Sequence, residues 1–306
     1  MRLARWMALA PALIVSLTGC VYQMQRNGAQ EQTSGGLPPL VTDRPDQTES
    51  SETVTPGYMQ LEVGGSRVDS SDKGDPIDHE FAAPETLIRL GLARALELRL
   101  IFDGYQMQDV VSKDGNANGF GDTAIGFKYK LFEQDGFIPQ TALLAHISMP
   151  TGADGHSSEE WDPDFRINMS NELNEMFSLA YNLGVEWETA PSTGGDRDTD
   201  SFFIYTVALG IGLTEEWGMF LEFFGDAPLN QRGGDAHSFD AGITYLVHEN
   251  LQLDTAVGIG LTSEAPDWFA TVGFSWRFPV WGDAEGSQIA QRDAGMRTAS
   301  MLLPRQ

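Results

Sequence analysis

The chain has 306 residues, with 44 acidic and 19 basic side chains and a single cysteine. Its formal net charge of −25 argues against nucleic acid as a partner, because phosphate binding needs clustered Lys and Arg. One cysteine excludes an intramolecular disulfide framework and a cysteine-rich zinc site.

The first residues have the pattern of an export signal. Arg2 and Arg5 precede an apolar stretch that ends at Leu17 and is too short to cross a bilayer as a mature helix. Cys20 follows after two small residues, a pattern that resembles the lipobox of bacterial lipoproteins. We therefore predict a signal peptide over 1–19 and lipidation of Cys20. The alternative is a chance cysteine after an ordinary export signal.

Residues 20–56 are rich in Gln, Ser, Thr, Gly, Pro and acidic residues, and they show no apolar periodicity. A segment of this composition cannot bury enough apolar surface to fold by itself. We predict a flexible periplasmic tether that joins the lipid at Cys20 to a folded domain.

From Tyr58 onward, apolar residues recur at every second position, the period of a strand with one apolar and one polar face. In the last such segment Trp268, Val272 and Trp276 share one face, whereas Thr271 and Ser275 lie on the other. About twelve strands are predicted, at 58–65, 86–93, 95–103, 121–131, 137–148, 164–171, 176–187, 201–213, 216–224, 238–247, 250–261 and 267–278.

The connections between these segments alternate in length. Those after the even-numbered segments are short, whereas those after the odd-numbered segments are mostly long, polar and rich in Gly and Pro. This alternation is the pattern of periplasmic turns and extracellular loops in an outer-membrane barrel. We predict an all-β, up-and-down antiparallel transmembrane barrel over 57–278. Both ends of the barrel, and a tail over 279–306, are then expected in the periplasm.

Aromatic residues on the apolar face favour this barrel over the alternative, a soluble β-sandwich. They lie toward strand ends, where the two interfacial girdles of a membrane barrel are found. Period-two patterning is common to both classes, but a sandwich gives no reason for girdles. The predicted girdle residues are Phe177, Trp187, Phe203, Trp217, Phe223, Trp268, Trp276 and Phe278.

The polar faces of the strands are expected to line the lumen. Charge inside hydrocarbon is costly, so charged residues on this face must meet water or one another. Two interpretations remain open: a salt-bridge ladder that fills a narrow barrel, and a constriction that selects permeants by charge and width. The candidate lumen charges are Arg89, Glu97, Arg99, Asp103, Arg166, Glu186, Glu222 and Asp240.

Five apolar residues fall among these polar neighbours. Phe202, Phe224 and Phe269 lie at strand ends that join long connections, so we expect them to cluster near the extracellular mouth. An apolar patch with a few polar groups suits a hydrophobic solute, although packing against an inward-folded loop explains it equally well. The candidate permeant-contact residues are Phe202, Ile204, Phe220, Phe224 and Phe269.

Several short blocks stand in a definite order between residues 42 and 278. They are Thr42-Asp43-Arg44-Pro45-Asp46, Thr55-Pro56-Gly57, Gln60-Leu61-Glu62, Gly119-Phe120-Gly121-Asp122-Thr123, Gly126-Phe127-Lys128-Tyr129-Lys130-Leu131 and Met149-Pro150-Thr151-Gly152. Their order and spacing resemble the outer-membrane transporter family labelled "MetA-pathway of phenol degradation".

The resemblance implies a transmembrane barrel, distantly similar to fatty-acid and toluene uptake channels, that passes small hydrophobic or aromatic compounds by passive diffusion. The stretch from Thr271 to Phe278 also resembles a barrel-assembly signal. The expected partners are outer-membrane lipids, the barrel-assembly and lipoprotein-sorting machineries, and a small apolar solute. No cofactor or metal site is predicted.

Two other classes remain open. A sealed barrel lipoprotein would anchor or scaffold without conducting. A lipid-modifying enzyme would need a nucleophile and a base at the membrane edge, and His146 with Ser148 is the nearest candidate pair. No nucleophile, base and orienting group can be assembled from the sequence, so no catalytic residue is predicted.

Overall fold

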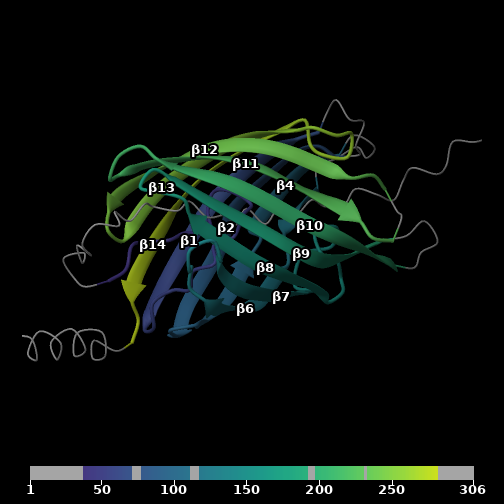
Figure 1. The fold of residues 1–306 in the computed structure, drawn as a ribbon. Helices are drawn as coiled ribbons and strands as arrows, with labels where there is room; N and C mark the ends of the chain where they lie inside the picture. The colour runs from purple at the N-terminus through teal and green to yellow at the C-terminus, as the bar shows by residue number, and fades with distance from the viewer. Residues whose placement is uncertain (1–36, 71–76, 111–116, 192–196, 231–232, 282–306) are drawn as a thin grey trace, which may run out of the picture.

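The computed structural model describes residues 37–70, 77–110, 117–191, 197–230 and 233–281, and its strands form one antiparallel sheet (Figure 1). No helix in this part of the chain is long and apolar enough to cross a membrane. The strands are β1 (Tyr58–Asp69), β2 (Ile77–Ala93), β3 (Leu96–Phe102), β4 (Tyr105–Val110), β5 (Ala117–Phe120), β6 (Thr123–Phe132), β7 (Gln140–Met149), β8 (Asp162–Glu172), β9 (Phe177–Pro191), β10 (Arg197–Gly212), β11 (Trp217–Pro228), β12 (Ala236–His248), β13 (Leu251–Gly260) and β14 (Trp268–Pro279).

The sheet closes on itself to form a barrel. One edge of β1 pairs with β14, from Tyr58 opposite Pro279 to Asp69 opposite Trp268, and its other edge pairs with β2. β3 and β4 both pair with β2, so they are two parts of one interrupted strand. β5 pairs with β4 and β6 pairs with β3, so these two form the next strand. The labelled segments therefore make twelve barrel strands, which confirms the predicted architecture.

The two ends of the barrel differ. Neighbouring strands are joined by short turns at one end, as between Ala93 and Leu96 or between His248 and Leu251. The long connections, such as 150–161, lie at the other end. We call these the turn end and the loop end. Tyr58 and Pro279 face each other at the turn end, where both termini of the barrel wall therefore lie.

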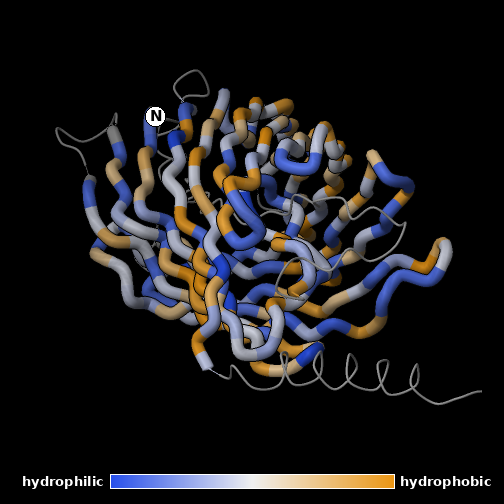
Figure 2. The backbone as a smooth tube through the Cα atoms, turned by 90° about the vertical axis from the view of Figure 1, so that its left-hand side faces the viewer, coloured by the Kyte–Doolittle hydropathy of each residue, from blue (hydrophilic) through white to orange (hydrophobic). Residues whose placement is uncertain are grey.

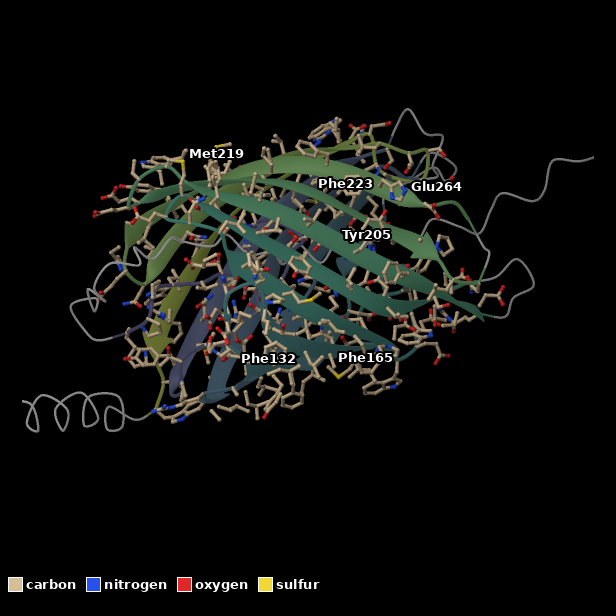
Figure 3. All side chains as sticks on the ribbon, in the orientation of Figure 1. Phe132, Phe165, Tyr205, Met219, Phe223 and Glu264 are labelled. Atoms are coloured by element: carbon tan, nitrogen blue, oxygen red, sulfur yellow. The ribbon has the colours of Figure 1, made fainter. Side chains whose placement is uncertain are left out.

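Side chains alternate between an apolar outer face and a polar lumen. On β13, Leu253, Val257 and Ile259 are about half-exposed on the outside, whereas Gln252 and Asp254 are buried inside. Figure 2 shows the same alternation of hydrophobic and hydrophilic residues along the wall, and Figure 3 shows Phe132 and Phe165 projecting away from it. Large apolar side chains are thus exposed while charged ones are buried, the inverse of a soluble protein.

Most strands extend beyond their predicted limits at the loop end. β2 begins at Ile77 rather than at 86, and β11 continues to Pro228 rather than ending at 224. The prediction relied on alternating apolar residues, and that alternation is needed only where the outer face meets hydrocarbon. Beyond this band, polar residues continue the hydrogen-bonded ladder without an apolar face. The pattern therefore marks the membrane band rather than the strand.

The expectation of a flexible tether over 20–56 is wrong for the part of that segment that the structure describes. Residues 42–51 are all buried, and they lie inside the barrel. Composition indicates only how much apolar surface a segment can bury, but this stretch is stabilised by polar and ionic contacts with the lumen wall. The predicted signal peptide over 1–19, the lipidation of Cys20 and most of the tail over 279–306 fall outside the described residues.

Candidate functional site

Residues 37–57 form a loop inside the lumen, and we call them the luminal segment. Near its start, the Nη1 atom of Arg277 donates to the carbonyl of Pro39 at 3.2 Å. Near its end, the hydroxyl of Thr53 donates to the carbonyl of Arg94 at 3.1 Å. Arg94 lies in the turn between β2 and β3, and Arg277 lies near the end of β14. The segment therefore enters the barrel and returns at the turn end.

The luminal segment has no regular secondary structure, so side chains of the wall satisfy its backbone. The amide of Asp43 donates to the Glu62 carboxylate at 2.9 Å. The amide of Gln47 donates to Glu222 at 2.7 Å, and that of Glu49 donates to the Asn182 side-chain oxygen at 2.7 Å. Buried backbone groups need such partners, and here the polar lumen provides them.

Asp43 is the centre of a buried ion cluster. Its Oδ2 atom lies 3.2 Å from Arg89 Nη1 and 2.8 Å from Lys128 Nζ, and it also pairs with Arg99. Its Oδ1 atom accepts hydrogen bonds from both the amide and the hydroxyl of Ser50. These side chains are almost completely buried. One aspartate of the luminal segment therefore joins cations from three wall strands, β2, β3 and β6.

Three glutamates complete the cluster. Glu97 bridges Arg89 at 2.8 Å and Arg99 at 3.0 Å, and both arginines lie opposite each other in the β2–β3 register. Glu62 contacts Arg89 at 3.1 Å, and Glu49 contacts Arg99 at 2.7 Å. Removing one member of such a buried group typically costs about 3–5 kcal/mol, because the remaining charges lose their compensation. The cluster therefore anchors the luminal segment to one side of the wall.

Arg44 extends from the luminal segment toward β13 and β14. Its Nη2 atom lies 3.2 Å from Asp254 and donates to the Thr271 hydroxyl at 2.8 Å. Two inward-facing glycines make room for this guanidinium, since a Cβ atom at Gly64 would lie 2.2 Å from its Cζ atom and one at Gly273 would lie 2.6 Å from its Nε atom. The guanidinium of Arg44 therefore packs directly against the backbone of these two glycines.

The predicted lumen charges separate into four groups. Arg89, Glu97 and Arg99 meet in the ion cluster around Asp43. Arg166 lies between Asp164, at 3.3 Å, and Glu186, at 3.6 Å. Glu222 and Asp240 face each other in the β11–β12 register. Asp103 belongs to none of these three groups, and the carboxylates of Asp122 and Glu80 repel its charge.

His146, the candidate base of the enzyme alternative, faces the lumen. Its Nε2 atom accepts from the Arg99 guanidinium at 2.9 Å, so its Nδ1 atom carries the proton and donates to Asp164 at 3.0 Å. Both ring nitrogens are thus engaged inside the barrel rather than at the membrane edge.

In the described residues, no group of three or more His, Cys, Asp or Glu side chains is arranged to hold a metal ion.

The structure brings together only some of the apolar lumen candidates. Phe224 and Phe269 meet edge to face, with ring centroids 5.8 Å apart. Ile204 is buried, and Phe202 lies at the level of Glu186. Phe220 is completely buried next to Ala256, nearer the turn end, so it belongs to a different level of the lumen.

Asp122 attaches the 150–161 connection to the barrel. Its Oδ1 atom accepts from the amides of Thr151 at 2.9 Å and Gly152 at 2.7 Å, and its Oδ2 atom accepts from the amide of Ser158 at 3.0 Å. The amide of Thr123 donates to the Thr151 hydroxyl at 3.0 Å. Two of the sequence blocks that carry the family resemblance are therefore joined here.

Sequence reasoning missed Asp43, Arg44, Asp46 and Glu49, because it placed them in a tether. The available signal was the resemblance itself, whose first block, Thr42 to Asp46, precedes the first strand. A family block outside the barrel wall indicates that this stretch has a structural partner. In the structure, this partner is the set of polar side chains on the lumen face of the wall.

Comparison with known proteins agrees with this architecture. A family model described as "Putative MetA-pathway of phenol degradation" matches residues 42–278, which include the luminal segment from Thr42 onward. No curated protein sequence matches the chain.

Solved barrels share the fold at low sequence identity. The translocator domain of the autotransporter NalP from Neisseria meningitidis is 11% identical with a TM-score of 0.51, and the alignment covers 74% of this chain and 90% of that one. The NanC porin is 10% identical with a TM-score of 0.50, over 71% of this chain and 98% of that one. The CymD monoaromatic hydrocarbon channel is 9% identical with a TM-score of 0.42, over 74% and 89%. The similarity to the NalP domain and to NanC concerns the barrel fold alone.

Proposed function

We propose that this chain, which belongs to the family described as "Putative MetA-pathway of phenol degradation", is an outer-membrane channel for small hydrophobic or aromatic compounds. The observation that carries the proposal is that a chain segment outside the wall fills the lumen. A narrow barrel is filled by its own side chains. This barrel is wide enough to hold a stretch of polypeptide, so displacement of that stretch leaves a passage for a small solute.

The side chains that line the loop-end half of the lumen favour a hydrophobic permeant. Phe224 and Phe269 form an aromatic pair there, and Ile204 is buried on the same side of the wall. Arg166 and Glu186 provide polar groups at a similar level, next to Phe202. Small-molecule sites typically combine apolar walls with a few polar groups that fix orientation. Transport is by passive diffusion along the concentration gradient of the solute.

The apolar outer face supports residence in a membrane, with lipids of the outer membrane as its partners. Both termini of the wall lie at the turn end. If Cys20 carries the predicted lipid, that anchor lies in the periplasmic leaflet and the turn end faces the periplasm. Delivery then requires the lipoprotein-sorting machinery as well as the barrel-assembly machinery.

The test is planar-bilayer conductance of the wild type and of the double variant Asp43→Ala/Glu49→Ala. The double variant removes the acidic anchors of the luminal segment, which are also the ion-pair partners of Lys128. Arg89 keeps Glu62 and Glu97 as wall partners, and Arg99 keeps Glu97. Each buried anchor is worth about 3–5 kcal/mol, so the segment should leave the lumen and conductance should rise at least tenfold.

Glu52→Ala is the matched control, because Glu52 pairs with Lys130 at a partly exposed position of the same segment. An exposed pair contributes about 0–1 kcal/mol, so this variant should behave like the wild type. Heat-modifiable mobility on a gel shows that each barrel is folded. A folded double variant that does not conduct would support the sealed, anchoring barrel instead.

A further inference from the structure

One flank of the luminal segment faces a group of carboxylates without a cation. Glu222 on β11 and Asp240 on β12 lie directly opposite each other, and Asp46 of the luminal segment interacts electrostatically with both. All three side chains are at most 1% exposed. This contrasts with the opposite flank, where every carboxylate contacts arginine or lysine.

Glu222 already serves as the acceptor for the luminal segment. It accepts hydrogen bonds from the amide of Gln47, at 2.7 Å, and from the hydroxyl of Thr48. With all three groups ionised, no described residue donates a hydrogen bond to Asp240, and none other than Asp46 itself donates to Asp46. Glu222 and Asp240 can hydrogen-bond to each other, which requires one proton between them.

Among the residues that the structure describes, no cation lies beside Asp46, Glu222 or Asp240. On β13, Asp254 is paired with Arg44 at 3.2 Å. The luminal segment contributes Asp43, whose cations belong to the ion cluster. β10 contributes Thr206, which is bonded to Thr48, and β9 contributes Asn182, which is bonded to Glu49; both are neutral.

The carboxylate oxygens of Asp46 and Asp240 are out of reach of water. A hydrated or chelated cation therefore has no room beside them while the luminal segment is in place. A proton needs no additional volume, so it can neutralise one of these carboxylates in the closed barrel.

We infer that Asp240, Glu222 and Asp46 form a proton-binding site that latches the luminal segment inside the barrel. Protonated Asp240 donates to Glu222, and Glu222 in turn holds Gln47 and Thr48. Loss of the proton leaves Glu222 and Asp240 both charged, buried and directly opposite each other, and only solvation can relieve this repulsion. Solvation requires the luminal segment to leave. This inference rests on the proposed channel function, because it assigns the control of opening to this site.

The direction of the pH effect follows from linkage. The closed state binds a proton that the open, hydrated state releases, so acid favours closure and a rising pH favours opening. For one coupled proton the ratio of open to closed barrels changes by up to about tenfold per pH unit. The ion pairs of Asp43 and Glu97 on the other flank do not oppose this effect between pH 5 and 8, because the arginines and lysine that contact these two carboxylates keep them ionised throughout that range.

The experiment measures conductance of the full-length protein in planar bilayers at pH 5, 6.5 and 8. Wild-type conductance should rise stepwise with pH. Asp240→Asn supplies a permanent amide donor to Glu222, so this variant should remain closed at pH 8. A second readout is cleavage by a glutamate-specific protease after Glu49, which is buried, relative to Glu175 in an exposed turn of the same molecules. This ratio should rise with pH only in proteins that retain the latch.

His146→Gln is the matched control, because His146 is a lumen side chain outside the latch whose ring contacts Arg99 and Asp164. The rise in conductance with pH should persist in this variant. If the rise is lost, the response depends on His146 rather than on the three carboxylates, and the latch is wrong. A step of wild-type size in Asp240→Asn would also overturn it. If Asp43→Ala/Glu49→Ala conducts while the wild type shows no pH response, the latch is wrong and the channel stands. If no folded variant conducts at any pH, the proposed function itself fails.

Discussion

Arg99 on β3 is completely buried in the lumen, where its guanidinium contacts Asp43, Glu97 and Glu49 and donates to His146. The sequence placed Arg99 and Glu97 on the lumen face, because the period of two in a strand fixes the side on which a side chain lies. It could not identify Asp43 or Glu49 as their partners. In a segment without periodicity, the spacing of residues does not show which side chains point in the same direction, so their contacts cannot be derived from the sequence.

At the residue scale, the proposed contact of the permeant with the loop-end aromatics can be tested on two neighbouring positions of β11. Phe224 pairs with Phe269 inside the barrel, whereas Phe223 lies on the outer face beside Tyr205. Phe224→Ala should reduce uptake of a small aromatic compound into proteoliposomes several-fold, because an apolar contact in the lumen is lost. Phe223→Ala should leave uptake near the wild-type rate. Equal uptake by both variants would contradict a role for the aromatic pair.

At the scale of elements, the luminal segment and the 150–161 connection follow the same principle. Neither has an apolar periodicity, yet each is held by polar groups of the wall. Composition predicts that such a segment cannot form a core of its own, and that remains correct. It does not predict whether another part of the molecule provides partners. The tether expectation failed for this reason.

The attachment at Asp122 gives a prediction for the 150–161 connection. Asp122→Ala removes the acceptor of three amides, those of Thr151, Gly152 and Ser158, and each net hydrogen bond is worth roughly 1 kcal/mol. Hydrogen exchange at these amides should therefore accelerate at least about tenfold, while exchange in the strands stays unchanged. Asp154→Ala, in an exposed part of the same connection, should leave exchange unaltered. Unchanged exchange in Asp122→Ala would mean that the connection is held by other contacts.

At the scale of the whole molecule, closure of the sheet separates an apolar exterior from a polar interior. Val257 and Val272 are more than half-exposed in the middle of β13 and β14, while Arg89, Arg99 and Lys128 have no exposed surface. This distribution is stable only if the exterior meets hydrocarbon and the interior charges meet one another. In the ion cluster, the luminal segment contributes Asp43 and Glu49 to this charge balance.

The exterior can be tested at Val257. An arginine at the midplane of a barrel's lipid face typically lowers the free energy of unfolding by about 2–4 kcal/mol, so Val257→Arg should do so in lipid vesicles. Ser263→Arg, in the exposed connection between β13 and β14, should change it by less than about 0.5 kcal/mol. Reversible denaturant unfolding followed by tryptophan fluorescence measures both. Equal stability of the two variants would show that Val257 does not face hydrocarbon.

The sequence by itself determined the twelve-stranded barrel, the apolar and polar faces of its wall and the family to which it belongs. It could do so because strand periodicity and the alternation of connection lengths are local properties of the chain. Only the tertiary structure decided what fills the lumen and which charges meet. Asp43 and Arg99, or Asp46 and Asp240, are far apart in the chain, and closure of the sheet around the luminal segment brings them together.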